Sequence, residues 1–190
     1  MSKKIVLTGG GTAGHVNPNL ALVPLLKEHD FEISYIGSEK GIEKEIIARA
    51  DLPFYGISSG KLRRYFSWEN FSDIFKILKG YSQSKKILKK LRPDILFSKG
   101  GYVSVPVVFA ANRMKIPVVI HESDYTPGLA NRLCIPKAKR VCVSFEAACK
   151  HIPEEKCVKT GSPVRAELFA GSREAGLARL GFSGQKPVLH

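Results

Sequence analysis

The chain has 190 residues, of which 44% are hydrophobic and 25% charged, and 30 lysines and arginines against 17 acids give a formal net charge of +13. This length suits one domain, or one domain with part of another, and the composition excludes an intrinsically disordered chain. Its apolar runs are far shorter than the roughly 18 residues of a membrane-spanning helix. The apolar run after Lys4 is also too short for a signal peptide, so we expect a cytoplasmic protein.

Strands and helices are predicted to alternate along the first half of the chain. A short apolar run predicts a strand over Lys3–Thr8, and Asn17-Pro18 is typical of a helix N-cap followed by proline in the first turn. The predicted elements that follow in order are a helix to Glu28, a strand over Glu32–Ile36, a helix over Ile42–Ala50, a strand over Phe54–Ile57, a basic loop over Ser58–Ser67 and a helix over Glu69–Leu91.

The alternation continues after Arg92-Pro93, which ends the long helix. Strands are predicted over Ile95–Ser98, Pro117–His121, Arg140–Ser144 and Cys157–Thr160, with helices over Val105–Met114, Pro127–Leu133 and Phe145–His151 between them. Strands that alternate with helices predict an α/β fold, a Rossmann-like parallel sheet with helices on both faces.

The composition changes near the end of the chain. Gly171–Gln185 holds four glycines and a weak helix pattern over Glu174–Leu180, and Pro187-Val188-Leu189 reads as the start of another strand. We therefore expect one domain over residues 1–168, and over residues 169–190 a linker and the first strand of a second domain that is absent.

The positive charge is concentrated in residues 61–92, which hold ten lysines and arginines against two acids. Such a stretch fits nucleic acid, an anionic membrane surface or a phosphorylated ligand.

The long helix has two apolar faces. Helical spacing places Phe71, Phe75, Leu78 and Tyr81 on one face, and Ile77, Ser84, Leu88 and Leu91 on another that we assign to the core. The aromatic face is flanked by Arg63, Arg64, Lys76, Lys79 and Lys85, which favours peripheral binding to an anionic leaflet. The alternative is that Phe71 and Phe75 fill the core.

The four cysteines, at positions 134, 142, 149 and 157, contain no Cys-x-x-Cys pair. This spacing does not favour a zinc site, and in a cytosolic chain we expect reduced, partly buried thiols.

Three loops follow predicted strands, where parallel sheets bind ligands: Gly9–Gly14, Gly100–Pro106 and Gly161–Arg165. None has the pattern of a P-loop or of a dinucleotide site.

Four individual residues near these loops are candidates for a role. His15 follows the first loop, where a general base could stand, although a lone histidine is more often structural. Glu122 ends another strand, and we assign a structural role to the neighbouring His121. Arg165 could pair with a phosphate.

Four motifs occur in order: Gly9-Gly10-Gly11-Thr12-Ala13-Gly14-His15, Gly100-Gly101-Tyr102-Val103-Ser104-Val105-Pro106, His121-Glu122-Ser123-Asp124 and Gly161-Ser162-Pro163-Val164-Arg165. Together they make the chain resemble the MurG family of GT-B glycosyltransferases over about residues 3–168. The resemblance implies the N-terminal, acceptor-side half of a two-domain enzyme at the cytoplasmic face of the bacterial membrane. That family transfers GlcNAc from UDP-GlcNAc to the MurNAc 4-hydroxyl of lipid I, with inversion, and so forms lipid II for peptidoglycan synthesis.

The resemblance also implies roles for individual residues. His15 is the implied catalytic base, with Glu122 as the rival. The implied sites for the acceptor pyrophosphate are Gly10, Gly11, Thr12, Ala13, Gly14, Gly100, Gly101, Tyr102 and Ser104. Those for the donor are Thr12, Ala13, Gly14, Asp124 and Arg165. No Asp-x-Asp is present, in agreement with chemistry that needs no metal or other cofactor.

The chain departs from the family's usual pattern at three places. Ala13 replaces a glycine, Ser162 replaces an asparagine, and Ser123-Asp124 stand where Gln-Asn is common, so an amide donor is missing. Two alternatives stay open: a GT-B transferase acting on another lipid acceptor such as diacylglycerol, and a membrane-lipid binding module without catalysis. No nucleic-acid motif is present, and the 190 residues alone are expected to transfer no sugar.

Overall fold

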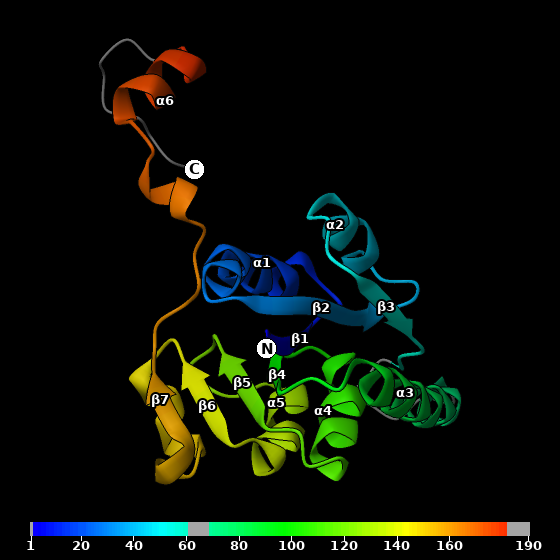
Figure 1. Ribbon diagram of the computed structural model, residues 1–190. Helices are drawn as coiled ribbons and strands as arrows, with labels where there is room; N and C mark the ends of the chain where they lie inside the picture. The colour runs from blue at the N-terminus through cyan, green and yellow to red at the C-terminus, as the bar shows by residue number, and fades with distance from the viewer. Residues whose placement is uncertain (1, 61–68, 182–190) are drawn as a thin grey trace.

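The computed structural model describes residues 2–60 and 69–181, and the side chains of the long helix from Asp73 onward (Figure 1). Within these residues seven parallel strands form one sheet in the order β3-β2-β1-β4-β5-β6-β7. The strands are β1 Lys3–Thr8, β2 Phe31–Ser38, β3 Phe54–Ile57, β4 Ile95–Ser98, β5 Val118–Glu122, β6 Arg140–Val143 and β7 Cys157–Lys159. The predicted Rossmann-like α/β fold is confirmed.

Helices cover both faces of the sheet. The α-helices are α1 Ala13–Glu28, α2 Glu43–Arg49, α3 Glu69–Leu91, α4 Ser104–Arg113, α5 Leu129–Cys134 and α6 Arg173–Leu180. Short 3-10 turns lie at η1 Ile135–Lys137, η2 Glu146–His151, η3 Glu154–Lys156 and η4 Ala166–Phe169. Figure 1 shows α1 and α2 on one side of the sheet and α3, α4 and α5 on the other.

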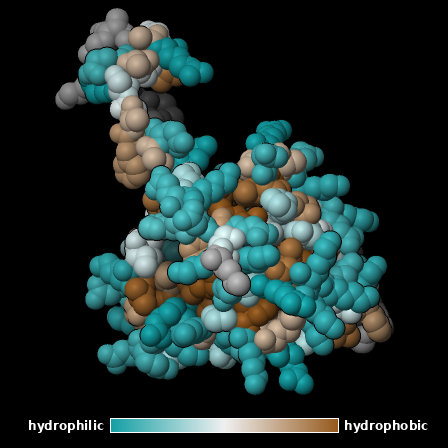
Figure 2. Space-filling view, viewed as in Figure 1, coloured by the Kyte–Doolittle hydropathy of each residue, from teal (hydrophilic) through white to brown (hydrophobic). Residues whose placement is uncertain are grey.

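Each face of the sheet has its own apolar core, because side chains alternate along a strand. In β1, Ile5 and Leu7 belong to the core under α1 and α2, whereas Val6 belongs to the core under α3 and α4. Along β2, Tyr35 and Ile36 divide in the same way. Figure 2 shows hydrophilic residues around the outline and hydrophobic ones gathered toward the middle, over the sheet. This double burial explains why the strands are short apolar runs without alternation.

The first helix begins four residues earlier than the predicted N-cap. Thr12 is the N-cap of α1, with an extended backbone, so Asn17 and Pro18 lie inside the helix. The glycines after β1 turn the chain within three residues, and the side chain of Asn19 then holds the helix by donating to Thr8 O at 3.2 Å. The prediction that Asn17 caps this helix is wrong, and the motif residues Ala13, Gly14 and His15 form its first turn.

The prediction of reduced thiols fails for two of the four cysteines. Cys149 and Cys157 form a disulfide between η2 and the start of β7, with Cα atoms 5.8 Å apart. The β6–β7 crossover is only a pair of 3-10 turns, so it brings these two positions together although they are eight residues apart. Cys134 and Cys142 are free.

The strand order reverses at β1 and β4, which places a topological switch point at their carboxyl ends. From β1 the chain proceeds outward through β2 to β3, and from β4 it proceeds outward to β7. After β7 the chain leaves the sheet, and α6 stands apart from it and buries no side chain (Figure 1). The loops that follow β1, β4 and β5 therefore border one crevice, where open parallel sheets bind ligands.

Candidate active site

A pocket of about 320 Å³ lies at the switch point. It is bordered by the first turn of α1, the end of β4 and the loop after β5; the lining residues are Gly14, His15, Lys99, Gly101, Glu122, Ser123, Asp124, Gly128, Leu129, Ala130 and Asn131. Three of the four sequence motifs thus contribute to one cavity, as expected from strand ends that share one edge of the sheet.

His15 is the third residue of α1, and its half-buried imidazole lines this pocket. Its Nδ1 lies 2.9 Å from Thr12 Oγ1. Burial, with a smaller contribution from the charge of Lys99, lowers the pKa of His15 below its ordinary value of 6.5, against the opposing charges of Glu122, Asp124 and Glu43. The imidazole is therefore neutral at neutral pH, which is the form that can accept a proton.

Glu122 lines the same pocket, but its carboxylate is buried and accepts three hydrogen bonds from the protein. Its Oε1 accepts from the amide of Asp124 at 2.9 Å, and its Oε2 accepts from the amide of Gly128 at 3.2 Å and from Asn131 Nδ2 at 2.8 Å. Three donors to one charged group anchor the loop between β5 and α5. Of the two residues predicted as the base, Glu122 thus has a carboxylate that accepts from protein donors, whereas His15 presents a neutral imidazole at the pocket.

The first glycine loop divides into two parts. The amide of Gly10 donates to Gly100 O at 3.3 Å, and the amide of Gly11 donates to Glu43 Oε1 at 3.2 Å. These two residues therefore tie the loop to the protein and do not present their amides to a ligand. The backbone amides at the helix start differ from these two, because amides of the first helical turn have no acceptor within the helix. They belong to Thr12, Ala13 and Gly14.

The second glycine loop is also bound largely to itself. Gly101 has φ +83°, and a Cβ there would lie 2.0 Å from Gly10 O, so only glycine fits where the two loops touch. Ser104 is buried and its hydroxyl donates to Gly101 O at 2.7 Å, while the amide of Gly100 donates to Ser98 Oγ at 3.3 Å.

Tyr102 packs its ring against Gly11, where a Cβ would approach the ring to 2.5 Å. Of the second-loop residues predicted to bind pyrophosphate, Gly101 lines the pocket, whereas Ser104 is turned into the protein.

The predicted donor-site residues are brought together only in part, since Gly14 and Asp124 line the pocket and Arg165 does not. Asp124 is exposed and lines the pocket. Arg165 lies on the connector after β7, is exposed, and is not among the residues that line this pocket. His121, by contrast, has the predicted structural role: it is buried, and its Nε2 lies 2.8 Å from Gly161 O, which joins the end of β5 to the fourth motif.

Two charged residues that matter here escaped the sequence analysis. Lys99, directly after β4, is 3% exposed, and Glu43, at the start of α2, is fully buried. Lysine and glutamate are almost never fully buried unless they are paired, so a single sequence gives no reason to place either one inside. The signal available for Lys99 was its position at a strand end, beside the second glycine loop.

The two predicted faces of α3, one for the membrane and one for the core, can be compared with the exposure of their side chains. Phe75 is 71% exposed and Leu78 is 59% exposed, so they do not fill the core, while Ser84 and Leu88 are buried as predicted. Tyr81 differs from the prediction, because it is half-buried against the core on the α3–α4 side. It lies one turn from the buried Ser84, at the border between the two faces of the helix.

The cations around this face are only partly described. Lys79 is exposed, and Lys76 Nζ lies 2.9 Å from the buried carboxylate of Asp73. Arg63, Arg64 and the side chain of Phe71 lie outside the described residues. None of the described helices is both long enough and apolar enough to cross a membrane.

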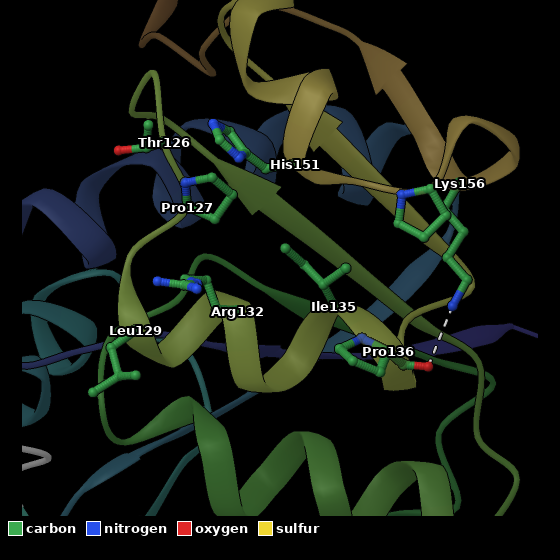
Figure 3. A pocket seen from close by; sticks show the side chains of 9 residues that line it. Thr126, Pro127, Leu129, Arg132, Ile135, Pro136, His151 and Lys156 are labelled. Atoms are coloured by element: carbon green, nitrogen blue, oxygen red, sulfur yellow. Dashed lines mark hydrogen bonds between the residues drawn. The ribbon is translucent and has the colours of Figure 1, made fainter.

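A larger cavity, of about 1020 Å³, lies beside α5 and the β6–β7 crossover (Figure 3). It carries the side chains of Arg132, His151 and Lys156, and Lys156 Nζ donates to Pro136 O at 3.2 Å. It holds none of the residues predicted to act in catalysis or to bind phosphate. The predicted catalytic residues His15 and Glu122 therefore line the smaller pocket and not this one.

Comparison with known proteins identifies the family of the chain. Residues 5–143 match the glycosyltransferase family 28 N-terminal domain. The chain is similar to the UDP-N-acetylglucosamine--N-acetylmuramyl-(pentapeptide) pyrophosphoryl-undecaprenol N-acetylglucosamine transferase of Lachnoclostridium phytofermentans, with 60% identity over 98% of this chain and 53% of that protein. The enzyme of the same name from Clostridium botulinum strain Alaska E43 is 59% identical over 98% of the chain and 52% of its own length.

The fold is also found in solved structures. The crystal structure of Acinetobacter baumannii MurG matches with a TM-score of 0.73 and 29% identity, covering 85% of this chain and 46% of that one. A Staphylococcus aureus MnaA–UDP co-structure, 14% identical with a TM-score of 0.64 over 86% of this chain and 46% of its own, shares the fold. The chain spans about half the length of the curated relatives it matches. It belongs to glycosyltransferase family 28 and contains that family's N-terminal domain, the N-terminal Rossmann-like half of a GT-B glycosyltransferase.

Proposed function

We propose that this chain is the acceptor-binding half of an inverting N-acetylglucosaminyltransferase, which moves GlcNAc from UDP-GlcNAc to the MurNAc 4-hydroxyl of lipid I and so forms lipid II. The observation that carries the proposal is a neutral histidine in the switch-point pocket, beside the open first turn of α1. The 59–60% identity to transferases named for this reaction supports it.

The acceptor hydroxyl must lose a proton as it attacks the anomeric carbon, and we assign its removal to His15 Nε2. For Nε2 to accept, Nδ1 carries the ring proton and donates it to Thr12 Oγ1 at 2.9 Å. The new bond joins the acceptor oxygen to the anomeric carbon, the bond to the UDP oxygen breaks, and UDP leaves with the electron pair. The proton stays on His15 until solvent removes it. Glu122 is not the base in this scheme, because three donors already occupy its carboxylate.

The pyrophosphate of lipid I needs an anion site near the reacting sugar. The amides of Ala13 and Gly14 in the first turn of α1 suit it, since a helix N-terminus carries partial positive charge and unpaired N–H groups. Gly101 gives the ligand close access to the loop. Gly10, Gly11, Gly100 and Ser104 act behind this surface by holding the two loops together.

We assign the donor nucleotide mainly to the half of the relatives that this chain does not cover. Asp124 borders the pocket from this side, and Arg165, on the connector, would reach the leaving diphosphate only in the complete protein. Helix N-termini and arginine can stabilise a leaving diphosphate, so the proposed chemistry uses no metal. Residues 169–190 are proposed to link to that second domain.

We further propose that α3 docks the protein on the anionic leaflet of the cytoplasmic membrane, where lipid I resides. Exposed Phe75 and Leu78 supply apolar contacts, and Ile74 beside them is 53% exposed. Lys79, Lys85 and Lys86 are exposed on the same helix. Apolar groups ringed by cations are the composition of a peripheral membrane surface.

The test uses the full-length protein, UDP-GlcNAc and a soluble lipid I analogue, with transfer followed by a radiolabelled sugar. We expect transfer by the parent and a loss of about 10²–10⁴-fold in turnover for His15→Ala. The matched control is His29→Ala, at the exposed end of the same helix. Transfer to diacylglycerol but not to the lipid I analogue would reject the acceptor. Tight binding of lipid I with no transfer would instead identify a binding module.

A further inference from the structure

We propose that the ammonium group of Lys99 is the cationic contact for a substrate diphosphate in the switch-point pocket. This rests on the function proposed above and adds to it a residue that neither the motifs nor the relatives assigned.

The position of Lys99 is fixed from both ends. Its amide donates to Thr8 O at 2.9 Å, which sets the backbone between β1 and β4, and its Cβ packs beside Gly9. At the other end, Nζ donates to Ser123 Oγ in the loop after β5. The side chain therefore spans the switch point, from the end of β4 to the end of β5, and is 3% exposed.

The hydrogen bonds around Lys99 leave donors unused. An ammonium group has three N–H donors, and among the described residues Ser123 is the partner found for Nζ. The carboxylate of Glu122 is already taken by Asp124, Gly128 and Asn131. Glu122 and Asp124 help to keep the lysine charged, against burial, which lowers its pKa. A buried cation with spare donors is costly, and an anion in the pocket would remove that cost.

The surroundings favour a diphosphate as that anion. The same pocket is lined by Gly14, at the start of α1, where unpaired amides also attract negative charge. His15, in this same first turn of α1, lines the pocket together with Lys99, and the charge of Lys99 acts on its imidazole. A diphosphate held by Lys99 and the first turn of α1 would lie beside the proposed base. Both substrates carry such a group, so the experiment has one arm for each.

The experiment measures binding by the full-length protein with calorimetry, using a soluble lipid I analogue in one arm and UDP-GlcNAc in the other. Lys99→Met is expected to weaken one of the two ligands about 10- to 100-fold, the loss typical of a charged hydrogen-bond partner. Lys99→Arg, which keeps the charge, should recover part of the affinity. Lys40→Met makes the same charge change at an exposed turn and should leave both affinities unchanged.

Thermal unfolding separates binding from a structural role. Methionine is a long apolar side chain, so Lys99→Met should leave the melting temperature unchanged or raise it. A lower melting temperature with both affinities intact would overturn the proposal, and so would equal losses for Lys99→Met and Lys40→Met. If the parent binds a diphosphate through Lys99 but transfers no sugar, the proposed reaction fails and the contact stands. If the parent transfers sugar and Lys99→Met binds both ligands as well as the parent, only the contact fails.

Discussion

Thr12 Oγ1 lies 2.9 Å from Nδ1 of His15, so the hydroxyl at the N-cap of α1 contacts a side chain instead of capping a backbone amide. An N-cap threonine usually stabilises its helix by accepting from the amides two or three residues later. Here the hydroxyl contacts an imidazole, and in the proposed mechanism it accepts from Nδ1–H and leaves Nε2 to act as the base.

Thr12→Val is therefore expected to lower kcat of the full-length enzyme about 10-fold, because the imidazole loses its orientation and preferred tautomer. Thr12→Ser keeps the hydroxyl and should retain most of the activity. Steady-state kinetics with saturating substrates measure both. A fully active valine variant would show that the Thr12 hydroxyl does not position His15.

The pH dependence of kcat/KM should report the neutral form of His15. Burial, with the charge of Lys99, lowers the pKa of His15, so the active form persists below pH 6.5 and the rate falls as pH drops through the lowered value. Lys99→Met removes one cause of the shift and should move this acid limb to higher pH. Charges on Glu122, Asp124 and Glu43 oppose it and are unchanged in the variant. An acid limb above pH 6.5 in the parent would contradict the assignment.

The lowered pKa of His15 also makes the free energy of unfolding depend on pH. At pH values between the two pKa values of His15, the unfolded chain binds more protons than the folded one. This contribution is therefore full above about pH 6.5 and is lost as pH falls through the lower, folded value.

Glu122→Gln is expected to destabilise the domain by about 2–4 kcal/mol, since one carboxylate oxygen becomes an amide that faces backbone or side-chain donors. Urea unfolding of the 190-residue chain measures this. Glu32→Gln, at an exposed pair with Lys4, is the control and should change stability by less than about 1 kcal/mol. Unchanged stability together with a large loss of kcat would return Glu122 to the role of base.

Gly101→Ala should cost several kcal/mol of folding free energy, because the new Cβ would lie 2.0 Å from Gly10 O at a backbone φ of +83°. Gly128→Ala is the matched control: it has φ −63°, and nothing lies within 4 Å of its Cβ position. That change should be neutral or stabilising by up to about 1 kcal/mol. Denaturant midpoints of the two variants test whether the close contact between the two glycine loops, and not the loss of any glycine, causes the loss of stability.

On α3, the double change Phe75→Ser with Leu78→Ser should leave the fold intact, because both side chains are mostly exposed. Binding to vesicles that contain anionic lipid should fall, and cosedimentation at matched salt measures it. Leu88→Ser, at a fully buried position of the same helix, should instead lower the melting temperature strongly. A folded double variant that binds vesicles as tightly as the parent, with the same salt dependence, would exclude this face.

Much of the fold could be predicted from the sequence because it depends on local patterns. Apolar runs bounded by glycine and proline predicted the strands Phe54–Ile57 and Ile95–Ser98 with the ends that the structure shows, and helical spacing did the same for Glu69–Leu91. The motifs also predicted that His15, Gly101, Glu122 and Asp124 meet, because strand ends of a parallel sheet share one edge.

Other features depend on which groups meet after folding, and only the tertiary structure decided them. A single sequence cannot show that three donors converge on Glu122, that Glu43 takes the amide of Gly11, or that Tyr81 turns toward the core. Nor does it show a lysine crossing between β4 and β5 below the surface. The physical reason is that hydrogen-bond partners and burial are set by contacts between segments far apart in the chain, whereas helix and strand patterns are set by neighbours within it.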